Sequence, residues 1–160
     1  MNRFLIACVF LVAATAAEEA LHRSGCPSGY TYRRHRGHCY KVFRTPQWWQ
    51  YAEYFCRADG AWLVTIRNRA DSVWVNNFFK RNKHNCPSSY WIGANDIVEE
   101  GVWRWAQNGR KVTYTNWGPN EPNNSNNEDA VLVYSSSRKW NDHKVDGNWC
   151  PKLCFVCETH

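Results

Sequence analysis

The segment NWGPNEPNNSNNED, residues 116–129, decides how the rest of this chain is interpreted. Residues 116–127 contain two prolines and six asparagines without apolar periodicity, a composition that predicts a loop. Together with residues 140–142, the segment carries six side chains with hard oxygen atoms: Glu121, Asn123, Glu128, Asp129, Asn141 and Asp142. Calcium takes about six to eight such oxygens in irregular geometry. We therefore expect a calcium ion to organise this loop.

Pro122 stands between two of the expected ligands, Glu121 and Asn123. Cis peptide bonds occur almost only before proline. A cis bond between Glu121 and Pro122 would turn the two flanking side chains toward one point.

The first 17 residues have the pattern of a secretory signal peptide. Arg3 precedes a short apolar run, residues 4–13, and small residues at 14–17 offer a cleavage site. The run is too short to span a bilayer, and no later segment approaches the length that spanning requires. We expect a secreted, extracellular protein without membrane insertion, whose mature chain, residues 18–160, forms a single domain.

Seven cysteines remain in residues 18–160, and export favours disulfides over metal binding for them. An odd number leaves at least one thiol that is free or that bridges to another chain. The full chain has a formal net charge of +6, with basic residues concentrated in residues 33–38. A solvated hairpin is one interpretation of that cluster, and a site for anionic glycans or acidic surfaces is the alternative. Nucleic-acid binding is not expected of an exported, disulfide-rich chain.

Hydrophobic periodicity predicts an α+β domain without repeats or linkers. Helices are expected over residues 47–58, opened by Pro46, and over residues 71–81. Strands are expected over residues 39–43, 61–66, 90–94, 102–105, 130–134 and 153–158. The apolar face of the first helix would comprise Trp48, Tyr51, Ala52, Phe55 and Cys56, and that of the second Val75, Phe78 and Phe79.

Several short motifs in this order resemble the C-type lectin domain. Gly25-Cys26-Pro27 and His38-Cys39-Tyr40 resemble the amino-terminal hairpin of its long form, Trp91-Ile-Gly-Ala94 its WIGL signature, Glu121-Pro122-Asn123 and Trp140-Asn141-Asp142 its sugar-site motifs, and Phe155-Val-Cys-Glu158 its closing strand. The resemblance covers nearly the whole chain after residue 17. It implies a C-type lectin-like fold with two helices, short antiparallel sheets and a long calcium-binding loop region.

The resemblance also implies a ligand set. The principal calcium and the carbohydrate would be held by Glu121, Asn123, Glu128, Asn141 and Asp142. An accessory calcium would be held by Asp96, Glu100, Asn124 and Asp129, although Asp96 and Glu100 are also explained as ordinary turn acids. In the family, the order Glu-Pro-Asn implies mannose-type sugars with equatorial 3- and 4-hydroxyls, whereas Gln-Pro-Asp implies galactose.

The cysteines depart from the family pattern. Ala130 stands where the family has a cysteine that staples the binding loop, and residues 143–149 look like an insertion. The resemblance still implies the bridges Cys26–Cys39 and Cys56–Cys157. Of the remaining Cys86, Cys150 and Cys154, we expect one internal bridge and one intermolecular thiol, which would link a homodimer.

Asn123-Asn124-Ser125 is the one N-glycosylation sequon of the chain and overlaps a predicted ligand. We expect Asn123 to be unmodified, because folding around bound calcium would bury its amide.

The tryptophans are expected mainly in the core. Trp62, Trp91, Trp103, Trp105 and Trp117 fit a stacked core, and the resemblance places Trp140 beneath the ligands. The alternative for an exposed aromatic residue near the site is a platform on which a sugar stacks.

The predicted function is a secreted, calcium-dependent lectin for mannose-type glycans, used in innate immunity to recognise microbial or foreign glycans. The alternative is a lectin-like protein of a matrix or a mineral surface. An enzyme is not expected, because nothing pairs a nucleophile with a base and the acids are accounted for as ligands.

Overall fold

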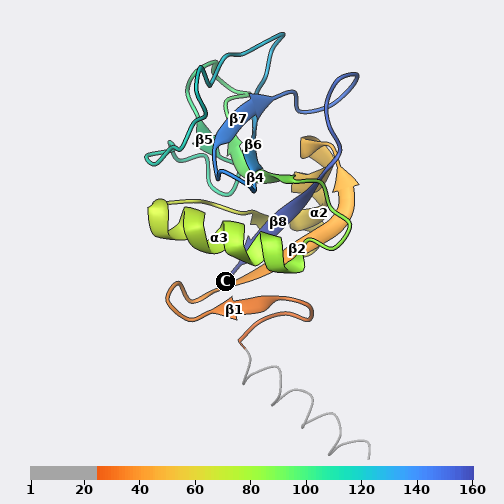
Figure 1. Ribbon diagram of the computed structural model, residues 1–160. Coiled ribbons are helices and arrows are strands. Elements are labelled where there is room, and N and C mark those ends of the chain that lie inside the picture. Colours follow the sequence, from red (N-terminus) through yellow and green to blue (C-terminus); the bar gives the residue numbers. More distant parts are fainter. Residues whose placement is uncertain (1–24) are drawn as a thin grey trace, which may run out of the picture. The chain divides into compact units, whose positions relative to one another are not determined.

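The computed structural model describes residues 25–160 (Figure 1). The predicted signal peptide, residues 1–17, lies outside the described residues. The chain divides into two compact units: a small one, whose described part is residues 25–40 with His160, and a large one, residues 41–159.

The small unit is a β-hairpin. Strand β1 (Thr31–Arg33) pairs antiparallel with the first residues of β2 (His38–Gln47). Gly37, at a φ of +68°, closes the turn by donating its N–H to the Arg33 carbonyl at 3.0 Å. A disulfide joins Cys26 to Cys39, the pairing that the family resemblance implies.

The large unit contains a mixed β-sheet whose strands follow the order β2-β8-β4-β6-β7. The bounds are β4 Ser89–Asn95, β6 Ala130–Tyr134, β7 Trp140–His143 and β8 Leu153–Thr159. Two short strands extend this sheet: β3 (Trp62–Leu63) pairs with β8, and β5 (Arg104–Trp105) pairs with β4. The α+β class is confirmed, but the pairing of β4 with β8 is parallel, which the sequence pattern did not predict.

Helix α3 (Arg69–Asn82) confirms the second predicted helix. It begins where the Asn68 side chain accepts a hydrogen bond from the Asp71 N–H at 2.9 Å, so a capping residue sets its start. Val75, Phe78 and Phe79 are buried, as their spacing predicts.

Helix α2 (Trp49–Ala58) begins later than predicted. Pro46 does not open it, because β2 continues through Gln47. The predicted apolar face is also wrong in part. Trp49, Ala52 and Cys56 are buried, whereas the side chains of Tyr51 and Phe55 are exposed. Aromatic residues at helical spacing therefore do not identify the buried face of α2, since tyrosine and phenylalanine also occupy its solvent-exposed face.

Two disulfides tie β8 to the rest of the large unit. Cys56 of α2 is bonded to Cys157, as the resemblance implies, and Cys86 is bonded to Cys154. Cys150 remains a buried thiol. The expected internal bridge among Cys86, Cys150 and Cys154 is therefore present, and the disulfide-linked homodimer stays a prediction.

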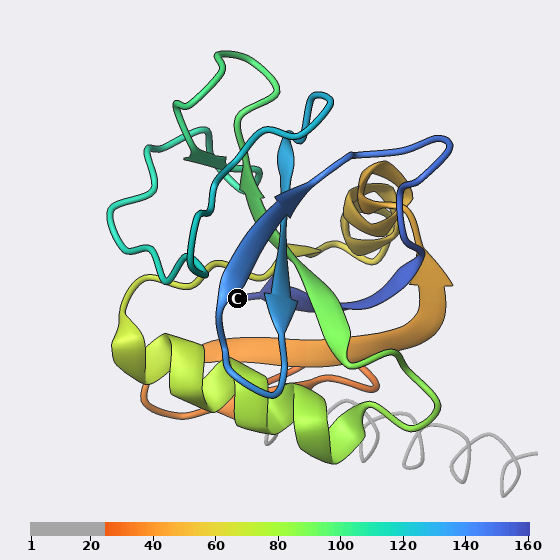
Figure 2. The ribbon, with the colours of Figure 1, turned by 45° about the horizontal axis from the view of Figure 1, so that its top comes forward.

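The loops that precede and follow β5 gather at one side of strands β4, β6 and β7 (Figures 1 and 2). Trp140, which is fully buried, lies among the rings of Trp105, Tyr114 and Trp117, with centroids 5.6–6.2 Å away. Trp91 and Trp62 are buried as predicted, whereas Trp103 and Trp117 are only partly buried. This aromatic cluster joins β5 and the loop that follows it to β7.

Candidate functional site

The β6–β7 hairpin brings the two predicted ligand motifs together. In its register, Ala130 faces His143 and Val131 faces Asp142. Glu128 and Asp129 directly precede β6, so they lie at the same end of the hairpin as Asp142.

The Asp142 carboxylate organises the loop above it. It is fully buried and accepts hydrogen bonds from the Asn123 N–H at 3.1 Å and from the Asn124 N–H at 2.7 Å. Bonds of this charge-assisted kind are stronger than those between neutral groups. Asp142 therefore fixes the backbone that follows Pro122.

The Glu121–Pro122 peptide bond is cis, as the sequence suggested. The Asn123 amide nitrogen donates to a Glu121 carboxylate oxygen at 2.7 Å, so the two flanking side chains meet. Burial, the hydrogen bond with Asp142 and the charges of Asp142 and Glu128 raise the pKa of Glu121 to about 7. Three carboxylates thus crowd one another at this turn.

Glu128 is buried and closes the far side of the loop. Its carboxylate accepts from the Ser125 N–H at 3.1 Å, and its own N–H donates to the Asn124 side-chain oxygen at 2.7 Å. Burial and the Asp142 charge raise the pKa of Glu128. Asn141, the fifth predicted ligand, is partly buried, and its amide nitrogen donates to the Asp142 carbonyl.

Most asparagines of the loop serve its backbone. Asn120, Asn124, Asn126 and Asn127 have φ values between +47° and +67°. Asparagine tolerates this left-handed region better than other residues with a side chain. The asparagine-rich composition thus reflects turn geometry as much as ligand chemistry, a distinction that the sequence alone did not reveal.

The residues predicted for the accessory calcium form a looser group. Asp96 donates its N–H to the Asp129 carbonyl at 3.1 Å, and burial together with the charges of Glu100 and Asp129 raises the pKa of Asp96 to about 6. Asp96 Oδ1 is buried without a hydrogen-bond partner in residues 25–160. The Asn124 N–H donates to Asp142, and the Asn124 side-chain oxygen accepts from the Glu128 N–H, so Asn124 also contacts residues of the principal group.

The donor chemistry fits a calcium ion. Among residues 25–160, no group of three or more His, Cys, Asp or Glu side chains is arranged to hold a metal ion. The predicted ligand set, however, draws on carboxamide oxygens as well, and calcium accepts both kinds. Crowded carboxylates attract a cation, since each disfavours the charged form of the others. The orphaned Asp96 oxygen is a second acceptor that a cation would satisfy.

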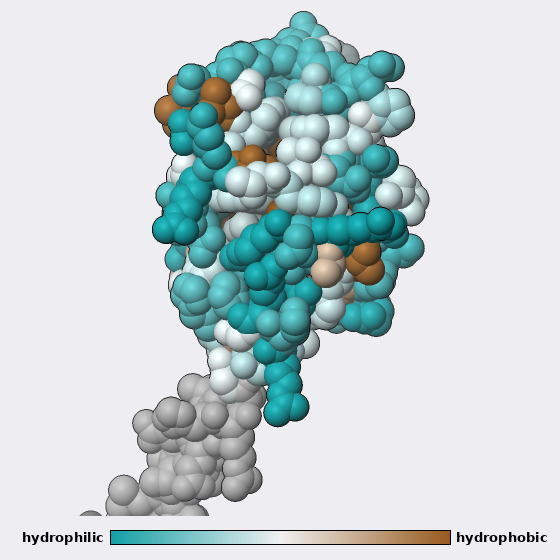
Figure 3. Space-filling model, turned by 90° about the vertical axis from the view of Figure 1, so that its left-hand side faces the viewer, coloured by the Kyte–Doolittle hydropathy of each residue, from teal (hydrophilic) through white to brown (hydrophobic). Residues whose placement is uncertain are grey.

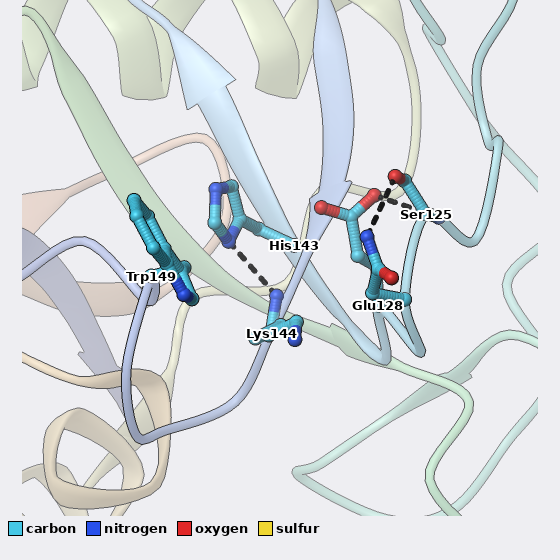
Figure 4. Close-up of a pocket in the computed structure, with 6 residues that line it drawn as sticks. Ser125, Glu128, His143, Lys144 and Trp149 are labelled. Carbon is cyan, nitrogen blue, oxygen red and sulfur yellow. Dashed lines mark hydrogen bonds between the residues drawn. The ribbon is translucent and has the colours of Figure 1, made fainter.

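A cavity of about 400 Å³ adjoins this site (Figure 4). It is lined by Ser125, Asn126, Glu128, His143, Lys144 and Trp149. Sequence reasoning did not identify it. Its only signal was the apparent insertion at residues 143–149, which begins at the last residue of β7 and supplies three of the lining residues.

Within the described part of the chain, no helix has the length and apolarity needed to cross a membrane. The face of the molecule in Figure 3 is mostly hydrophilic, with a few small hydrophobic patches.

Comparisons with known proteins agree with this architecture. Residues 45–159 match the family described as Lectin C-type domain. A C-type lectin mannose-binding isoform from Oxyuranus scutellatus is 33% identical over 168 residues, covering 99% of this chain and 98% of its own. A perlucin-like protein from Mytilus galloprovincialis is 34% identical over 119 residues, covering 73% and 74%.

Among solved structures, the C-type lectin CEL-I from Cucumaria echinata has a TM-score of 0.73 at 27% identity, covering 83% of this chain and 96% of its own. Domains of this family are typically non-enzymatic and bind carbohydrate. The chain therefore belongs to the C-type lectin family of carbohydrate-binding proteins.

Proposed function

We propose that this protein is a secreted, calcium-dependent lectin for mannose-type sugars. The observation that carries the proposal is the meeting of Glu121, Asn123, Glu128 and Asp142 around the Glu121–Pro122 turn. A signal peptide at residues 1–17 and a mature lectin domain at residues 18–160 are part of the proposal. We further propose that the glycans it recognises are microbial or foreign.

The principal ion would be held by Glu121, Asn123, Glu128, Asn141 and Asp142. A calcium ion held by these residues would supply coordination to vicinal hydroxyls of a sugar. Glu121 and Glu128 would accept hydrogen bonds from these hydroxyls. Asn123 and Asn141 would donate to them, because each amide nitrogen carries a second hydrogen beyond its present bond. Glutamate before Pro122 and asparagine after it place acceptor and donor in the order that the family uses for mannose-type sugars.

The accessory ion would be held by Asp96, Glu100 and Asp129, with Asn124 as the fourth predicted ligand. The buried Asp96 Oδ1 supports this assignment, since it has no hydrogen-bond partner in residues 25–160. A second ion would join the 96–101 turn to the residues that precede β6.

Retention on immobilised mannose tests the proposal. We expect the protein to bind mannose–agarose in calcium and to elute fully with a chelator, because the sugar hydroxyls need the ion as well as the side chains. Galactose–agarose is the matched control and should retain little protein. Undiminished retention on mannose in chelator contradicts calcium dependence, and stronger retention on galactose contradicts the predicted specificity.

Asn123 is expected to carry no glycan in the active protein. Its side chain is exposed rather than buried, but its amide nitrogen donates to Glu121 and its oxygen accepts from the Ser125 N–H at 2.9 Å. A glycan on that nitrogen would stand where the sugar ligand binds. Intact mass spectrometry of protein eluted from mannose–agarose should show the unmodified mass. A fully occupied sequon in that fraction would contradict the predicted role of Asn123.

A further inference from the structure

The cavity beside the proposed calcium site has walls of different chemistry. Figure 4 shows Trp149 and His143 on one side and Ser125 and Glu128 on the other, with Lys144 between them. Glu128 is also a predicted calcium ligand, so a sugar held there would stand at the mouth of the cavity. The volume of about 400 Å³ falls in the range of about 300–1,000 Å³ that is typical of ligand sites.

Trp149 is the most exposed of the large hydrophobic side chains in residues 25–160, with 89% of its surface accessible. Its φ of +74° is rare for a bulky residue. Residues in such conformations persist only where their surroundings impose them, and they cluster at functional sites. An indole ring presented in this way at a cavity offers a flat apolar face to a ligand.

The segment that carries Trp149 is held at its base. The Cys150 thiol donates to the Lys144 carbonyl at 2.8 Å, and the Cys150 N–H donates to the Gly147 carbonyl at 3.2 Å. The Gln50 N–H, from α2, donates to the Val145 carbonyl at 3.4 Å. These bonds make residues 144–150 a closed loop, so the backbone that carries Trp149 is held at several points.

The remaining walls supply polar groups. The Lys144 ammonium group offers three donors, and the side chains of Ser125 and Asn126 offer both donors and acceptors. The Glu128 carboxylate on the same wall would repel an anionic substituent. The chemistry of the cavity therefore suits a neutral, hydroxyl-rich ring with one apolar face, which describes a hexose.

We propose that this cavity is a second sugar subsite, in which a neutral hexose linked to the calcium-bound sugar stacks on Trp149 and hydrogen-bonds to Lys144 and Asn126. The inference rests on the proposed function and deepens it, since it makes the ligand a neutral oligosaccharide rather than a single terminal sugar. Two contacts on one ligand raise affinity because the second is made intramolecularly.

Calorimetry in calcium with methyl mannoside and with a mannotriose tests this subsite. We expect the wild-type protein to bind the mannotriose at least about tenfold more tightly, which corresponds to about 1.4 kcal/mol. Trp149→Ala should abolish that preference and leave the affinity for methyl mannoside unchanged. Trp149→Phe should keep most of the preference, because phenylalanine also stacks. Lys144→Met should reduce it in part.

Tyr54→Ala is the matched control, since Tyr54 is an exposed aromatic residue of α2 outside this cavity, and it should change neither affinity. Equal binding of both sugars by the wild-type protein, or an unchanged preference in Trp149→Ala, overturns the subsite alone. Equal losses for both sugars in Trp149→Ala overturn it as well, since they assign the indole to the primary site. Absence of calcium-dependent binding to methyl mannoside overturns the proposed function and the subsite together.

Discussion

Asp142→Asn is expected to abolish retention on mannose and to weaken calcium binding by about 100-fold or more. The substitution keeps the size of the side chain but removes the charge. It also places an NH₂ group against one of the two N–H donors, those of Asn123 and Asn124, that the carboxylate now satisfies. The loop thus loses an internal anchor at the same time as the ion loses a ligand.

Calcium titration calorimetry measures this effect, and circular dichroism shows whether the variant is folded. Asp146→Asn is the matched control, because Asp146 is an exposed carboxylate four residues further along the chain. It removes the same charge without touching the Glu121–Pro122 turn, and it should bind calcium and mannose normally. A folded Asp142→Asn protein with normal calcium affinity would contradict the assignment of Asp142 as a ligand.

Glu158→Ala is expected to lower the free energy of unfolding by about 3–5 kcal/mol. The Glu158 carboxylate is fully buried in β8 and forms an ion pair with Arg67 at 2.8 Å. It also accepts from the Thr65 N–H at 2.9 Å and from the Trp62 indole N–H at 3.3 Å. Truncation to alanine leaves these buried donors without an acceptor. The folded state then carries the free-energy cost of their desolvation.

Asp59→Ala provides the control for this prediction. Asp59 pairs with Lys41 at the same distance of 2.8 Å, but its side chain is 39% exposed. Exposed ion pairs contribute about 0–1 kcal/mol, so the control should unfold at nearly the wild-type urea concentration. A similar loss of unfolding free energy in the two variants would contradict the view that burial, rather than ion pairing alone, makes Glu158 contribute strongly to stability.

Much of the fold was predictable because apolar spacing is a direct physical signal. Val75, Phe78 and Phe79 predict the buried face of α3, and residues 130–134 form the predicted strand β6 without change of bounds. The start of α2 was not predictable from Pro46. Proline is compatible with a first helical turn and also with a strand edge, and the pairing of neighbouring strands decides between the two.

The candidate site also has a part that the sequence predicts and a part that it does not. The residue types around Glu121 and Asp142 predict a site with oxygen ligands. The β6–β7 register then brings the segments that carry these residues together. The cavity beside them was not predictable, since residues 143–149 have no periodicity and the path of the backbone at Trp149 depends on hydrogen bonds that Cys150 makes to Lys144 and Gly147. Contacts between irregular segments leave no pattern in a sequence.

The inner position of β8 in the sheet has a consequence for biosynthesis. Because β8 lies between β2 and β4, the sheet of the large unit cannot close until residues 153–159 have left the ribosome. Until then Cys56 and Cys86 remain reduced, since their partners Cys157 and Cys154 are both in β8. During that interval these two thiols are able to form a non-native disulfide with each other. Correct oxidation of the large unit therefore follows translation of its final strand and benefits from a disulfide isomerase.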